Sequence, residues 1–97
     1  MSNDFNAVVR WEPRKRTLIK PGLTYTTASR LVSNTIKMTN PWSMVVQIGS
    51  ATGLNGLETF ANVHFLFSET APNHLLARGA KFELYEGSHI TGIVTIL

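Results

Sequence analysis

Four cations lie between residues 14 and 20, in the segment RWEPRKRTLIK. Arg14, Lys15 and Arg16 are consecutive, Lys20 follows them, and Trp11 precedes them. Lys and Arg side chains bind nucleic-acid phosphates, and an aromatic ring can stack on an unpaired base. The segment therefore predicts an RNA-binding loop. A solvated connection whose charges keep a strand edge from aggregating explains the same residues at least as well.

The remaining polar residues do not form a pattern that predicts catalysis or metal binding. His64, His74 and His89 are too widely spaced to form the close pairs typical of metal ligands, so we expect solvent-facing histidines and no metal site. No nucleophile elbow accompanies the serines. The glycine-rich segment GSATGLNG is not followed by a lysine or by a predicted helix, and it is typical of a hairpin loop. We expect no catalytic residue, no cofactor and no enzyme activity.

Trp42 is the second candidate for a binding residue. It follows Asn40-Pro41 at the expected start of a strand. Such a ring could belong to the core, or it could be an exposed anchor for another protein. The second interpretation predicts a protein-interaction module, which could be an assembly subunit, an immunity or inhibitor protein, or a homo-oligomer.

Length and composition favour one small domain over residues 1–97. The chain is 43% hydrophobic and 15% charged, which is enough apolar surface for a core. It has no cysteine, so disulfides and thiolate metal sites are excluded. Its formal net charge of +3 is uneven: residues 1–37 hold seven Lys and Arg against two acids, and residues 38–97 hold two against four. No leader or membrane span is evident, so we expect a cytoplasmic protein.

The elements that must position these residues are short strands. Apolar and polar residues alternate with a period of two, with Val, Ile, Thr, Phe and Tyr recurring. The alternation predicts strands over 5–12, 23–28, 30–40, 42–50, 58–67, 81–85 and 90–97, and the connection over 68–79 could hold one helical turn at 73–77. In the fifth strand, Ala61, Val63, Phe65 and Phe67 are the expected core residues. Six or seven such strands predict an all-β antiparallel barrel.

The end of the chain, ARGAKFELYEGSHITGIVTIL, carries a family resemblance. It resembles the closing segment of the C-terminal β-barrel domain of elongation factor Tu and related translational GTPases. The matching residues are Phe82, Leu84, Glu86, Gly87, Thr91, Gly92, Val94, Ile96 and Leu97. The resemblance implies a free-standing six- or seven-stranded barrel whose basic loop would lie on the side that faces the nucleotide domain and aminoacyl-tRNA in that family. Here GLTYTTA replaces the family's arginine-proline-aromatic motif, and the phosphate-binding loop of a GTPase is absent.

These observations predict a non-catalytic binding module. The first hypothesis is an RNA- or translation-linked protein that binds through Arg14, Lys15, Arg16, Lys20 and Trp11. The alternative is a protein-interaction module that binds through Trp42. We also expect the turn Glu86-Gly87-Ser88-His89 to form a hairpin, and the last strand to close the barrel by pairing with an earlier one.

Overall fold

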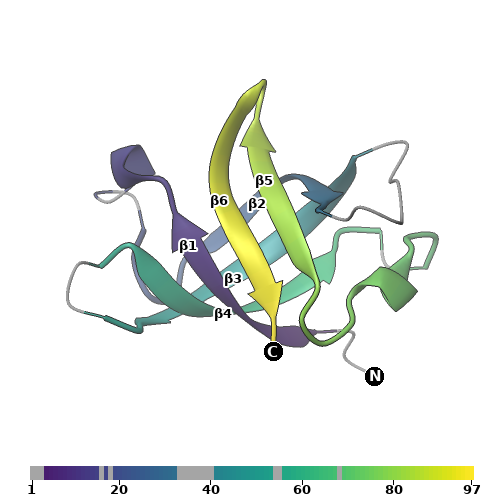
Figure 1. The fold of residues 1–97 in the computed structure, drawn as a ribbon, viewed down its shortest axis with the longest axis horizontal. Coiled ribbons are helices and arrows are strands. Elements are labelled where there is room, and N and C mark those ends of the chain that lie inside the picture. Colours follow the sequence, from purple (N-terminus) through teal and green to yellow (C-terminus); the bar gives the residue numbers. More distant parts are fainter. Residues whose placement is uncertain (1–3, 16, 18, 33–40, 54–55, 68) are drawn as a thin grey trace.

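The protein is a closed six-stranded antiparallel β-barrel, which confirms the predicted fold class (Figure 1). The computed structural model describes residues 4–15, 17, 19–32, 41–53, 56–67 and 69–97. The strands are β1 (Phe5–Trp11), β2 (Thr24–Leu31), β3 (Trp42–Ala51), β4 (Glu58–Phe65), β5 (Lys81–Glu86) and β6 (His89–Ile96). Two short 3₁₀ helices, η1 (Pro13–Lys15) and η2 (Asn73–Leu75), lie in the connections. The strand order around the barrel is β1-β4-β3-β2-β5-β6.

The apolar residues that alternate with polar ones along β1 and β4 are buried, and the residues between them face outward. Ala7, Val9 and Trp11 of β1 are buried, and the residues between them are at least partly exposed. In β4 the expected core residues Ala61, Val63 and Phe65 are buried, whereas Phe67 is 66% exposed. The prediction for Phe67 is wrong because β4 ends at Phe65 and the chain turns there, so the period of two no longer decides which side chains point inward.

Strand β2 is continuous where the sequence predicts a break after residue 28. It runs to Leu31 and includes Ser29, which is fully buried and donates a hydrogen bond from Oγ to the carbonyl oxygen of Trp42 at 2.7 Å. This bond satisfies a hydroxyl that interrupts the apolar pattern without interrupting the strand. The sequence predicts a separate strand over 30–40, but its first two residues belong to β2. Residues 33–40 lie outside the described part of the chain.

The last strand closes the barrel, as predicted. β6 pairs with β5, where Lys81 lies opposite Thr95, and with β1, where Ala7 lies opposite Ile96. Glu86 and His89 form the last pair of the β5–β6 hairpin, and Gly87 between them has φ of +62°. Glycine with positive φ at the first position of a two-residue loop is typical of a tight hairpin.

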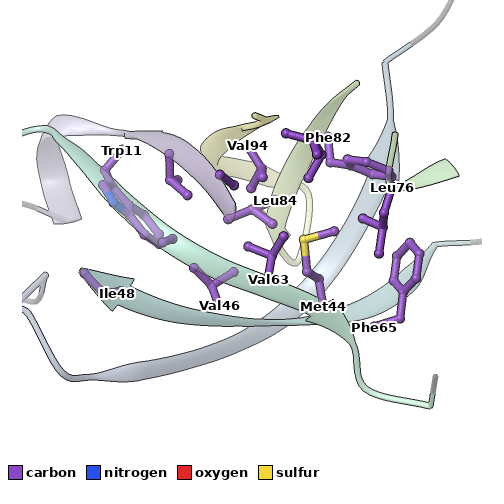
Figure 2. Packing of buried hydrophobic residues seen from close by; sticks show 14 residues of the cluster. Trp11, Met44, Val46, Ile48, Val63, Phe65, Leu76, Phe82, Leu84 and Val94 are labelled. Carbon is purple, nitrogen blue, oxygen red and sulfur yellow. The ribbon is translucent and has the colours of Figure 1, made fainter. Parts of the chain in front are cut away.

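The core fills the barrel from end to end (Figure 2). Trp11 lies at one end, Met44, Val63 and Leu84 lie in the middle, and Phe65 lies at the other end. Figure 1 shows η1 and η2 on opposite sides of the molecule, next to these two ends. The sequence allows one helical turn over 73–77, and the structure has the shorter 3₁₀ helix η2 over Asn73–Leu75. The two candidate binding regions from the sequence, the basic loop and Trp42, thus lie at opposite ends of the barrel.

Candidate functional site

The basic loop, which we define as residues 12–20, is attached to the barrel by its backbone. The Glu12 N–H donates to the carbonyl oxygen of Thr91 in β6 at 2.9 Å, and the Lys15 N–H donates to the carbonyl oxygen of Glu12 at 2.8 Å. Pro13 begins η1, where its fixed φ suits a helical turn and its missing N–H is not needed. These contacts place the start of the loop beside the β5–β6 hairpin.

Lys15 does not extend into solvent. Its side chain is only 16% exposed, its Nζ forms an ion pair with Glu86 Oε2, and it lies 5.4 Å from the centre of the Tyr25 ring. The Tyr25 hydroxyl donates to the same Glu86 oxygen and is 3.1 Å from Thr91 Oγ1. Lys15 therefore connects the basic loop to β2 and to the β5–β6 hairpin.

The protonation of this cluster follows from its contacts. The hydrogen bond to Glu86 raises the pKa of the Lys15 ammonium. Hydrogen bonds from Lys15 and Tyr25 lower the pKa of the Glu86 carboxyl. Burial, followed by the hydrogen bond to Glu86, raises the pKa of the Tyr25 hydroxyl. At neutral pH the cluster thus holds one cation and one anion, and the charge of Lys15 is balanced within the protein.

The other cations of the basic loop differ in their surroundings. Arg14 is 73% exposed and donates from Nε to Glu12 Oε1 at 2.8 Å. Lys20 is exposed, and Arg16 lies outside the described residues. An exposed ion pair such as Arg14–Glu12 contributes about 0–1 kcal/mol, so a phosphate could replace Glu12 at low cost. Arg14 and Lys20 are the described cations of the loop that an anionic partner could reach.

Trp11 is placed where it cannot stack on a base. It is only 3% exposed, and its Nε1–H donates to Thr59 Oγ1 at 3.0 Å. Its ring packs edge-to-face against Tyr25, with the ring centres 5.5 Å apart. The structure therefore separates Trp11 from the surface on which Arg14 lies. The alternation of β1 gives the signal for this placement, because it puts Trp11 on the same face as Ala7 and Val9.

A hollow of about 240 Å³ lies between the basic loop and the β5–β6 hairpin. Its lining residues are Glu12, Arg14, Lys15, Glu86, His89 and Thr91. Two acids balance two bases there, so the hollow has little net attraction for a phosphate. Among the described residues, no group of three or more His, Asp or Glu side chains is placed to hold a metal ion.

The histidines lie apart from one another in the structure. His74 and His89 are exposed, as expected, in η2 and at the β5–β6 turn. His64 is half-buried, and its Nδ1 lies 2.8 Å from Asp4 Oδ1. His64 thus lies on the outer face of β4, as expected, but its side chain beside Asp4 is only 28% exposed.

Trp42, at the start of β3, and two exposed apolar residues just after β4 lie at the other end of the barrel. The Trp42 ring is half-buried and packs at a tilt against Phe65, with the ring centres 6.4 Å apart. Leu66 and Phe67 follow directly after β4, and the Leu66 N–H donates to the Ser43 carbonyl oxygen at 2.8 Å. This bond holds the Leu66-Phe67 turn beside the start of β3. We call Trp42, Leu66 and Phe67 the end patch.

One cation, Arg30, lies near Trp42 in the β2–β3 ladder. Trp42 lies opposite Ser29 in the β2–β3 ladder, and the next residue of β2 is the exposed Arg30. Arg30 lies opposite Glu83 in the β2–β5 ladder. It lines a hollow of about 320 Å³ together with Pro41 and with Tyr85, Gly87 and Ser88 at the β5–β6 turn. The sequence prediction named Trp42 alone. It missed Leu66 and Phe67 because the alternation assigned Phe67 to the core.

No family model, curated protein or solved structure matches this chain. No helix in the described part of the chain is long and apolar enough to cross a membrane. The resemblance to the elongation factor Tu barrel therefore stays a prediction.

Proposed function

We propose that the protein is a non-catalytic protein-interaction module that binds its partner through the end patch. The observation that carries this proposal is the exposure of Phe67, which at 66% is the highest among the large hydrophobic side chains that the structure describes. Leu66 beside it is 46% exposed. Neighbouring exposed apolar side chains mark interaction sites more often than single ones do, and aromatic side chains contribute a large share of interface energies.

The partner that fits this surface is an acidic protein with an apolar pocket. The chain has a formal net charge of +3, and the exposed Arg30, opposite Glu83 in β5, is one residue along β2 from the partner of Trp42. Opposite charge on the partner would speed association and orient the complex, while Phe67 would supply buried apolar area. Trp42 is already held against Phe65, so little side-chain entropy is lost when it is covered.

RNA binding through the basic loop has less support. Arg14 and Lys15 each contact a glutamate, and Trp11 is in the core. A phosphate would have to displace Glu12 to reach Arg14 fully, and the ring expected to stack on a base is covered. Arg14 and Lys20 can still contribute a weak, salt-dependent attraction for anionic polymers.

Affinity capture with matched variants tests the proposal. We expect the immobilised protein to capture a specific acidic protein from a nuclease-treated native lysate, and Phe67→Ser to reduce its recovery at least about tenfold. Leu23→Ser is the control, because Leu23 is 46% exposed but lies outside the end patch, just before β2, and it should leave recovery unchanged.

Three outcomes would overturn the proposal. The first is equal recovery of the same partner with Phe67→Ser. The second is capture of RNA in place of protein when nuclease is omitted, with loss of the RNA on Arg14→Ala. The third is a stable homodimer in light-scattering measurements that Phe67→Ser converts to monomer, since the patch would then bind a second copy of the chain.

A further inference from the structure

Three carboxamides form a row across the outer face of the barrel, away from both ends. In the strand ladders Asn62 of β4 lies opposite Asn6 of β1 on one side and opposite Gln47 of β3 on the other. All three side chains are exposed. Directly opposed residues of neighbouring strands have Cβ atoms about 5 Å apart. The row thus presents three carboxamide side chains from neighbouring strands.

An aromatic ring borders this row. Phe60 lies two residues before Asn62, on the same outer face of β4, and it is 49% exposed. In β3 the register shifts between Ile48 and Ala51, and Gly49 approaches the Phe60 backbone so closely that a Cβ there would lie 3.0 Å from the Phe60 carbonyl oxygen. Gly49 therefore lets the β3 backbone pack closely against the backbone of Phe60.

These residues line a groove of about 460 Å³. Among the described residues that line it are Asn6, Gln47, Gly49, Phe60, Asn62 and Leu97, and no lining side chain is charged. This neutrality contrasts with the net charge of +3 for the whole chain. No side-chain hydrogen bond to the three carboxamides is present in the described part of the protein. The groove therefore offers carboxamide donors and acceptors that have no charged side chain beside them.

The chemistry of the groove fits hydroxyl groups. A carboxamide carries an acceptor oxygen and two N–H donors, and a hydroxyl is both a donor and an acceptor. A sugar ring combines several hydroxyls with an apolar face of C–H groups, which can pack on an aromatic ring. Binding sites of this class pair apolar and aromatic surface with a few placed polar groups.

We propose that this groove binds a neutral saccharide. The ring of Phe60 packs against the apolar face of the sugar, and Asn6, Asn62 and Gln47 form hydrogen bonds to its hydroxyls. A nucleic acid fits less well, because no cation lines the groove to meet its phosphates. A flat protein surface fits less well too, because it would desolvate three carboxamides without assured partners. This site is independent of the end patch.

Titration of the full chain, followed by backbone amide resonances, tests the proposal. The probes are maltohexaose, cellohexaose and chitohexaose, each raised to about 10 mM, where a Kd of about 1 mM is saturated. We expect at least one of them to shift the amides of residues 47–49 and 60–62. Phe60→Ala and Asn62→Ala should each weaken that binding about tenfold or more, and Leu23→Ala should leave it unchanged. Both groove positions are exposed, so these variants should fold, which a thermal melt checks.

Four results would overturn the saccharide proposal. Absence of shifts at these amides with all three saccharides would overturn the proposal, and so would shifts that Phe60→Ala leaves unchanged. Oligo(dT) is a further arm of the titration. If it shifts the same amides while no saccharide does, the groove binds nucleic-acid bases and the proposal is wrong. Line broadening that grows with protein concentration, without a saccharide effect, would assign the face to a second copy and would equally refute it.

Discussion

Among single residues, Glu86 has the largest effect on the charge that the basic loop presents to a partner. It accepts hydrogen bonds from both Lys15 and Tyr25, and it lies 71 positions from Lys15 in the sequence. The local segment suggests a strongly positive loop, whereas the folded loop faces a carboxylate from the opposite end of the chain. A count of neighbouring cations therefore overstates the charge that a partner of this loop would meet.

The substitution Glu86→Gln should destabilise the protein in a pH-dependent manner. The pKa of Glu86 is lowered in the folded state, so its contribution to stability is complete above the unfolded pKa, about 4.3, and is lost as pH falls through the folded pKa. Because the Glu86 side chain is 46% exposed, solvent screens the pair and we expect a loss of about 0.5–1 kcal/mol at pH 7. Urea unfolding at pH 7 and at pH 2.5 measures the difference, which should nearly vanish at the lower pH.

The control for this prediction is Glu69→Gln. Glu69 is exposed in the connection between β4 and η2, so its replacement should change the free energy of unfolding by less than about 0.5 kcal/mol at either pH. A loss for Glu86→Gln that is the same at pH 7 and pH 2.5 would contradict the role of its charge.

At the scale of elements, the sequence predicts the strands better than their ends. Alternation correctly places Val9 and Val63 inside and Phe60 outside, because the period of two is a local property of an extended chain. It fails for Phe67, because the end of β4 is set by the turn that joins it to η2, and for the break in β2, because a contact with Trp42 satisfies Ser29. The site is less predictable still, since the partner of Lys15 is fixed only when the barrel closes.

The β5–β6 hairpin should depend on the conformation of Gly87. Its φ of +62° is unfavourable for any residue with a Cβ, so Gly87→Ala should cost about 1–2 kcal/mol. Gly53→Ala is a matched control, because Gly53 does not have a positive φ and a Cβ there would meet nothing within 4 Å. Chemical denaturation of both variants measures the effect. Equal stabilities would show that the turn relaxes to accept a side chain.

In the molecule as a whole, the barrel keeps three candidate binding regions apart from one another. The basic loop and the end patch lie at opposite ends, and the carboxamide row lies on the outer face between them. The same core residues support all three regions, so a core substitution should affect them together. Surface substitutions in different regions share no partners and should act additively on stability.

Deletion of residues 93–97 should unfold the protein, because β6 is paired on both sides. The deletion removes the buried Val94 and Ile96, each of which contributes about 1.5–3 kcal/mol, and it leaves β1 and β5 with unpaired backbone groups. The two side chains alone account for about 3–6 kcal/mol, which reaches the lower end of the stability of about 5–15 kcal/mol that small domains have, and the unpaired backbone groups add to the loss. Far-ultraviolet circular dichroism and a thermal melt of the shortened chain measure the outcome, with deletion of Leu97 alone as the control. Leu97 is 56% exposed, and its loss removes one backbone hydrogen bond to Asn6 while the β6 ladders remain. Cooperative unfolding of the shortened chain would mean that the other five strands close the barrel without β6.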